Sequence, residues 1–186
     1  MLALATHGFR AYTSETALRT AVLEQPRAVP SVELETMDGQ VLDFGHWRGR
    51  WLLVDFIYTR CQTYCVVQGS QYAQLQDRLA PLLAAGNVGL ISLSFDPDVD
   101  DPAQLAAYQQ RSGDRGMGWI AARPQDAAGL AALKRSFGIT VIDDGFGGYL
   151  HNAALSVVDP DGRLVRIFGW DQMDAAEHYL RAQVGP

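Results

Sequence analysis

The sequence predicts an α/β fold in which helices cover both faces of a mixed β-sheet. Three observations lead to this prediction. Segments with strand-like patterns alternate with segments of helical periodicity along most of the chain. Two of the strand-like runs, 51–58 and 88–96, are almost continuously apolar, as expected for strands that are buried on both faces. Two more runs flank the turn sequence Asp-Pro-Asp-Gly at 159–162, which predicts an antiparallel hairpin.

The size and composition of the chain are those of one soluble globular domain. It has 186 residues, of which 48% are hydrophobic and 19% charged. The formal net charge is -6, and Lys134 is the only lysine, so we expect no nucleic-acid binding, which requires a positive surface. No apolar run approaches the roughly 18 residues that a membrane-spanning helix needs.

The N-terminal part predicts a helical extension. Ser14 can cap a helix over 14–25, and Pro26 prevents that helix from continuing. We therefore divide the chain into an N-terminal helical extension, residues 1–28, and one main domain, residues 29–186.

Within the main domain, predicted strands and helices follow in a recognisable order. The domain opens with a hairpin extension over 31–44, around a turn at Asp38 and Gly39. After the strand 51–58 we expect helix 66–86 with a bend at Pro81, strand 88–96, helix 101–111, strand 118–122, helix 124–138, a hairpin of 150–158 with 163–170, and helix 173–184. The order of strand, dithiol loop, helix, strand, helix, hairpin and helix is that of a thioredoxin-like domain.

Both cysteines, Cys61 and Cys65, directly follow the strand-like run 51–58. Cys61 is expected at the junction of strand and helix, and Cys65 about one turn into the helix. The N-terminus of a helix stabilises a thiolate, the form that attacks disulfides and binds metals. A structural disulfide, a redox pair and a metal site are the alternatives, and a bridge closing so short a loop would add little stability.

A metal site requires a third ligand. Two thiolates alone give linear Cu(I) coordination, whereas an added imidazole gives a three-coordinate site for a soft or borderline ion. His7, His46 and His178 lie where surface or packing roles are expected. His151 follows a glycine-rich loop and opens the strand-like run 150–158, which in a thioredoxin-like order lies beside the dithiol. His151 is therefore the candidate third ligand.

Three stretches of the chain, 54–65, 92–108 and 150–169, resemble in order and spacing the SCO1/SenC family of copper-binding cytochrome c oxidase assembly proteins. The resemblance implies a thioredoxin-like fold and copper, as Cu(I) or Cu(II), bound by two cysteines and one histidine. On this chain the ligands are Cys61, Cys65 and His151. The resemblance also implies a periplasmic location, either free or anchored to the membrane by an N-terminal segment outside this sequence.

Two functions follow from these residues. The resemblance implies a copper chaperone that helps to assemble the dinuclear copper site of cytochrome c oxidase, with the copper-binding oxidase subunit as partner and other copper chaperones or thiol reductants as further partners. The alternative is a thiol-disulfide oxidoreductase, in which Cys61, as the more exposed sulfur, attacks a partner disulfide and Cys65 resolves it. His151 separates the two, because a reductase needs no imidazole there. A peroxiredoxin is disfavoured, since Tyr58 stands where that chemistry needs a threonine.

The chain departs from the family pattern beside the ligands. Family members commonly have a proline after each cysteine, where this chain has Gln62 and Val66. Many have an acidic residue before the histidine that can orient its ring, and this chain has Leu150 there. That role is either lost or taken by Asp143 or Asp144 in the preceding loop.

Other residues near the expected site have plainer interpretations. Asp55 lies inside an apolar strand and would be costly if buried without a partner, so we expect it either hydrogen-bonded near the dithiol or structural. Asp96 and Pro97 are interpreted as a turn. Tyr58 and Tyr64 are expected to wall the site or to join the core.

Overall fold

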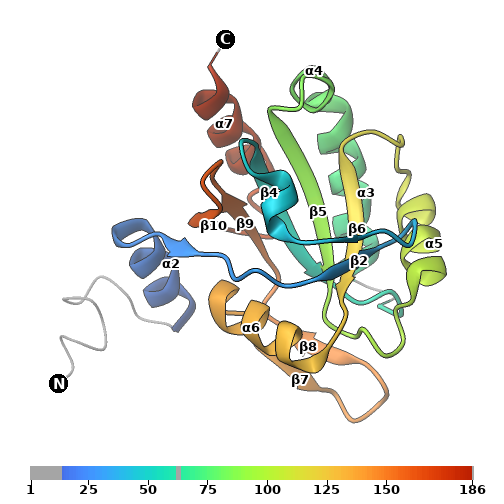
Figure 1. The fold of residues 1–186 in the computed structure, drawn as a ribbon. Coiled ribbons are helices and arrows are strands. Elements are labelled where there is room, and N and C mark those ends of the chain that lie inside the picture. Colours follow the sequence, from blue (N-terminus) through green and yellow to red (C-terminus); the bar gives the residue numbers. More distant parts are fainter. Residues whose placement is uncertain (1–13, 62–63, 186) are drawn as a thin grey trace, which may run out of the picture.

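The computed structural model describes residues 14–61 and 64–185, with the backbone alone for residues 64–66. An eight-stranded mixed sheet forms its centre, and a two-stranded sheet lies at one end (Figure 1). In spatial order the strands of the main sheet are β1 (Arg27–Ala28), β10 (Arg163–Gly169), β9 (Ala154–Val158), β4 (Trp51–Ile57), β5 (Val88–Ser94), β6 (Trp119–Pro124), β2 (Leu34–Thr36) and β3 (Val41–Leu42). The small sheet pairs β7 (Val141–Asp143) with β8 (Tyr149–His151).

Helices cover both faces of the main sheet (Figure 1). The helices are α2 (Ser14–Glu24), the 3-10 helix η1 (Phe44–Trp47), α3 (Tyr64–Arg78), α4 (Ala80–Ala84), α5 (Pro102–Ser112), α6 (Ala127–Phe137) and α7 (Met173–Val184). On one face α3 contacts both α5 and α7, and α6 packs on the opposite face. Within the described ranges, no helix has the length and apolarity needed to cross a membrane.

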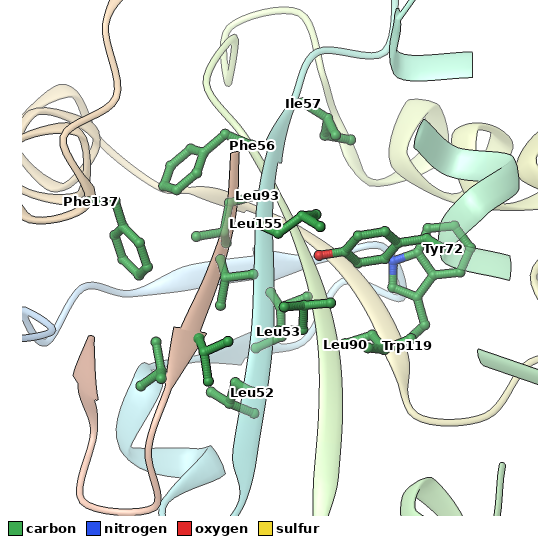
Figure 2. Packing of buried hydrophobic residues seen from close by; sticks show 14 of the residues in the cluster. Leu52, Leu53, Phe56, Ile57, Tyr72, Leu90, Leu93, Trp119, Phe137 and Leu155 are labelled. Carbon is green, nitrogen blue, oxygen red and sulfur yellow. The ribbon is translucent and has the colours of Figure 1, made fainter. Parts of the chain in front are cut away.

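The central strand β4 leads to the dithiol loop and is buried on both faces. It pairs in parallel with β5 and antiparallel with β9. Figure 2 shows Phe56 packed against Phe137 of α6 on one side of β4, and Tyr72 of α3 against Trp119 on the other. Burying one such large side chain stabilises the fold by about 1.5–3 kcal/mol, so the core fixes the end of β4 at which the cysteines begin.

Most of the predicted elements are present with bounds close to those expected. The hairpin around Gly39 forms, and β2 also pairs with β6, so this hairpin is an edge of the main sheet rather than a separate extension. The expected bend at Pro81 is a break between α3 and α4, since proline cannot donate the next helical hydrogen bond. The division of the chain at residue 28 stays a prediction; α2 contacts β10, and its Val22 is fully buried.

The segment 150–158 differs from its prediction as one strand. It is divided into the end of β8 and the separate strand β9. The side chain of Asn152 causes the break, because it accepts a hydrogen bond from the backbone N–H of Thr140 at 2.7 Å and donates one to the carbonyl of Gly138 at 3.0 Å. His151 therefore ends a short hairpin, and does not open a strand of the main sheet as predicted.

Candidate functional site

The dithiol loop begins where β4 ends. The backbone N–H of Cys61 donates to the carbonyl of Tyr58 at 3.3 Å, and α3 starts at Tyr64, which places Cys65 in its first turn. Cys61 is buried, with 9% of its surface exposed. The side chain of Cys65 lies outside the described residues, so the prediction that Cys61 is the more exposed sulfur stays a prediction.

A buried carboxyl group, that of Asp100, fixes the loop ahead of Cys61. The backbone N–H of Thr59 donates to both oxygens of Asp100, at 3.1 and 3.2 Å, and the Thr59 hydroxyl donates at 2.6 Å. The hydroxyl of Ser94 donates to the same carboxyl at 2.6 Å. Burial raises the pKa of Asp100 from its ordinary value, and the hydrogen bonds from Ser94 and Thr59 oppose that rise.

Asp96 contacts both segments that carry candidate ligands. Nη2 of Arg60 donates to Oδ2 of Asp96 at 2.7 Å, and the Tyr149 hydroxyl lies 3.4 Å from Oδ1. Hydrogen bonding to Asp96 raises the pKa of the Arg60 guanidinium. The backbone carbonyl of Asp96 forms the predicted turn, since it accepts from Val99 and Asp100. The carboxylate has a second role that the sequence interpretation missed.

His151 lies within an aromatic cluster at the end of the sheet. Its ring centre is 4.9 Å from that of Phe95 and 6.5 Å from that of Tyr58. Tyr149, two residues earlier on β8, packs against both of these rings at 5.6 and 5.3 Å. Tyr58 is also buried in the hydrophobic core, so its two interpretations, a wall of the site and a core aromatic, both agree with its position.

The imidazole of His151 is close enough to Cys61 to respond to its charge. Burial lowers the pKa of His151 from its ordinary value, and the charge of Cys61 opposes that lowering. A lowered pKa favours the neutral imidazole, the form that binds metals. Nδ1 of His151 is buried and has no hydrogen-bond partner among the described residues.

The three predicted ligands are thus partly placed. His151 lies within electrostatic range of Cys61, and the backbone of Cys65 belongs to the first turn of α3. The side chains that the structure describes contain no set of three His, Cys, Asp or Glu residues able to hold a metal ion. The sulfur of Cys65 is not among these described side chains.

Asp143 and Asp144 shape the turn of the β7–β8 hairpin. Oδ1 of Asp143 accepts from the N–H of Gly145 at 2.6 Å, and Oδ1 of Asp144 accepts from Phe146 at 2.8 Å and from Gly148 at 2.9 Å. These bonds hold the carboxylates within their own turn. No hydrogen bond between either carboxylate and the ring of His151 is present in the described part of the chain.

Asp55 is hydrogen-bonded to the helix that carries Cys65. Nε2 of Gln68, one helical turn after Cys65, donates to Oδ2 of Asp55 at 2.9 Å. Asp55 is fully buried, and burial raises its pKa to about 7, against the lowering effect of the neighbouring polar side chains of Ser92, Gln68 and Tyr72. This arrangement agrees with the first of its two interpretations, a hydrogen-bonded residue near the dithiol.

A cavity of about 480 Å³ opens beside the histidine. Its lining residues come from α2, from the link between β8 and β9, and from the end of β10: Glu15, Arg19, His151, Asn152, Ala153, Gly169, Trp170 and Asp171. Because these segments are distant in sequence, no local pattern indicated the cavity. It offers an approach to His151 from solvent.

The chain is similar to known proteins over most of its length. The SCO1/SenC family model matches residues 21–182. The SCO1 protein homolog of Bacillus subtilis (strain 168) is 29% identical over 137 residues, which cover 71% of this chain and 68% of the relative.

Two solved structures share the fold, which confirms the predicted fold class. BsSco, described as a member of the Sco family of cytochrome c oxidase assembly proteins with a disulfide switch, has a TM-score of 0.74 at 21% identity, over 86% of this chain and 95% of that one. ScoI of Bradyrhizobium japonicum with copper bound has a TM-score of 0.67 at 22% identity, over 82% and 97%. Since the family match spans most of its length, the chain belongs to the SCO1/SenC family.

Proposed function

We propose that this protein is a copper chaperone that carries copper on Cys61, Cys65 and His151 and delivers it to the dinuclear copper site of cytochrome c oxidase. The observation that carries the proposal is Nδ1 of His151, which is buried without a hydrogen-bond partner among the described residues. Such an atom is destabilising unless something binds it, and a metal ion would be a suitable partner. The charge of Cys61 acts on the same ring.

The donor atoms suit copper. Thiolates select soft ions such as Cu(I), and imidazole also suits Cu(II), so a site with two sulfurs and one nitrogen can hold either oxidation state. Cys65 lies in the first turn of α3, where the helix dipole favours negative charge. The copper-bound ScoI structure and the assembly role given for BsSco support the choice of metal and of partner.

Delivery requires a route from the site to a partner. We propose that the copper-binding subunit of the oxidase approaches through the cavity beside His151, and that its own ligands replace the imidazole first. Other copper chaperones or thiol reductants would supply the metal and keep the sulfurs reduced. The family resemblance points to the periplasmic side of the membrane as the place of this exchange.

Replacing the histidine tests the proposal. His151→Ala should abolish tight copper binding, because the site loses its third ligand, and should spare thiol-disulfide exchange. Equilibrium titration of the reduced protein with Cu(I) and with Cu(II) measures the effect. His178→Ala is a matched control, since His178 is exposed on α7. Unchanged copper affinity in His151→Ala would refute the ligand assignment.

The second candidate function is thiol-disulfide exchange with partner proteins. It is favoured by the position of the dithiol, with Cys61 three residues before the start of α3 at Tyr64 and Cys65 in the first turn of that helix. In this case the Cys61 thiolate attacks a partner disulfide, so that one partner sulfur leaves as thiolate and the other forms a mixed disulfide with Cys61. The Cys65 thiolate then attacks the sulfur of Cys61, releases the second partner thiolate and closes a Cys61–Cys65 disulfide. The reduction potential of the dithiol, measured with and without His151, distinguishes the candidates. Fast exchange together with no copper binding by the wild type would favour this one.

A further inference from the structure

We propose that Asp96 is a positioning residue that holds the hairpin carrying His151 against the loop carrying Cys61. The inference rests on the proposed function for its importance, since the two segments carry the candidate ligands. It does not rest on copper for its geometry, because the contacts that carry it join protein atoms only. Asp96 comes from neither segment, because it follows β5.

The first contact is with the dithiol loop. Arg60 directly precedes Cys61, and its Nη2 donates to Oδ2 of Asp96 at 2.7 Å. The Asp96 side chain is 9% exposed, whereas that of Arg60 is 46% exposed. A short hydrogen bond between opposite charges with one partner shielded from water is stronger than a neutral bond or an exposed ion pair. This contact ties the backbone beside Cys61 to the end of β5.

The second contact is with the hairpin. The Tyr149 hydroxyl lies 3.4 Å from Oδ1 of Asp96, a long hydrogen bond. Alternate residues of a strand share one face, so Tyr149 and His151 point to the same side of β8. Phe95, the neighbour of Asp96 in the chain, contacts both of their rings. The side of the hairpin that carries Tyr149 and His151, here called its inner side, therefore packs against the end of β5.

Strand pairing does not hold this hairpin to the main sheet. β7 and β8 pair with each other in a sheet of their own and not with the main sheet. Their outer side is exposed, with Ile142 58% and Leu150 65% accessible. The described contacts on the inner side are the aromatic cluster, the packing of Val141 and Tyr149 against the core, and three sets of hydrogen bonds. These bonds join the Tyr58 hydroxyl to the backbone of Tyr149, Asn152 to the backbone before β7, and Tyr149 to the Asp96 carboxylate. Loss of one of these should let the hairpin move away from Cys61 more often.

The role of the carboxylate can be separated from that of the turn. The backbone carbonyl of Asp96 accepts the turn hydrogen bonds from Val99 and Asp100, and Asn at this position can keep them. Asp96→Asn therefore removes the charge that Arg60 pairs with and leaves the turn intact. Asp98→Asn removes the same charge from the same loop at an exposed position, and is the matched control.

Two measurements test the proposal. In the reduced, metal-free protein, NMR relaxation dispersion at residues 141–151 should show microsecond-to-millisecond exchange in Asp96→Asn that is absent from wild type and from Asp98→Asn. In the copper-loaded protein, release of Cu(II) to a chelator should be about fivefold faster in Asp96→Asn. Arg60→Gln removes the ion pair with Asp96, and Tyr149→Phe removes the hydroxyl near Asp96. Each variant should therefore show part of the increase in hairpin exchange and in the rate of copper release.

The outcomes are decisive in both directions. Equal hairpin dynamics and equal copper release in Asp96→Asn and Asp98→Asn would overturn the proposal. A fall in the free energy of unfolding with exchange throughout the sheet would also overturn it, because Asp96 would then be a general structural residue. If the wild type binds no copper, the proposed function fails, and the metal-free NMR comparison still decides the role of Asp96.

Discussion

The carboxyl group of Asp55 lies wholly inside the protein, on the strand that leads to the dithiol loop. Burial raises its pKa from 3.8 to about 7. The unfolded chain, with a pKa near 3.8, therefore loses this proton at lower pH than the folded protein does. Between those two pH values the folded state binds more protons, so stability falls as the pH rises and the loss is complete above about pH 7.

Asp55→Asn should remove this pH dependence, since Asn keeps an acceptor for Gln68 and cannot ionise. From about pH 4 to about pH 8, the free energy of unfolding of the variant should rise relative to wild type by up to about 4 kcal/mol. Urea denaturation of the reduced protein over this range measures it. Asp98→Asn, which removes an exposed carboxyl group, is the control variant, and a curve for Asp55→Asn parallel to that of wild type would contradict the assignment.

Single residues differ in how far the sequence reveals their roles. Cys61, Cys65 and His151 are recognisable because their chemistry and order form a rare pattern. The side-chain roles of Asp96 and Asp100 are not, because each depends on a partner from another part of the chain. An Asp-Pro pair after a strand predicts a turn whether or not its carboxylate has such a partner, so the sequence does not reveal the partner.

At the scale of elements, α3 and α5 approach closely at Gly69. A Cβ at Gly69 would lie against the hydroxyl of Ser112 and 2.9 Å from its Cβ. Neither atom of Ser112 is at the end of a long flexible side chain, so one helix would have to shift. Because α3 also carries Cys65, the spacing of these helices contributes to the position of the dithiol.

Gly69→Ala should therefore destabilise the protein by about 1–3 kcal/mol, although alanine is the better helix former by about 1 kcal/mol. Thermal unfolding followed by circular dichroism measures the change. Adding Ser112→Gly should recover part of the loss, because it removes the atoms that the new methyl group meets. A Gly69→Ala protein more stable than wild type would show that the helices separate without cost.

The elements themselves were largely predictable, with one exception at the site. Buried strands such as β4 and capped helices such as α5, which has Asp101 as its N-cap and Gly113 as its C-cap, have strong local signals. The β7–β8 hairpin was missed because its strands are three residues long and its end is set by Asn152, which bonds to backbone groups before β7. Such a boundary depends on tertiary contacts.

At the scale of the molecule, the candidate ligands come from different halves of the chain. Only the folded sheet brings His151 towards Cys61, whereas the unfolded chain keeps the two cysteines near each other. A metal that binds all three ligands therefore binds the folded state more tightly than the unfolded one. Its effect on stability is the difference between these two affinities.

Copper should accordingly raise the thermal unfolding midpoint of the reduced protein. At a free concentration about 100 times the dissociation constant, stabilisation approaches about 2.7 kcal/mol, less any binding to the unfolded cysteines. Differential scanning calorimetry with and without copper measures the shift. The oxidised protein, with its sulfurs in a disulfide, is the control and should not respond; an equal shift there would place the bound copper elsewhere.

The outermost strands of the main sheet, β1 and β3, have two residues each. Edge strands this short offer another chain very few unpaired backbone amide and carbonyl groups with which to form hydrogen bonds. Fibril-like growth by strand addition to β1 or β3 is therefore disfavoured, even where many copies crowd together.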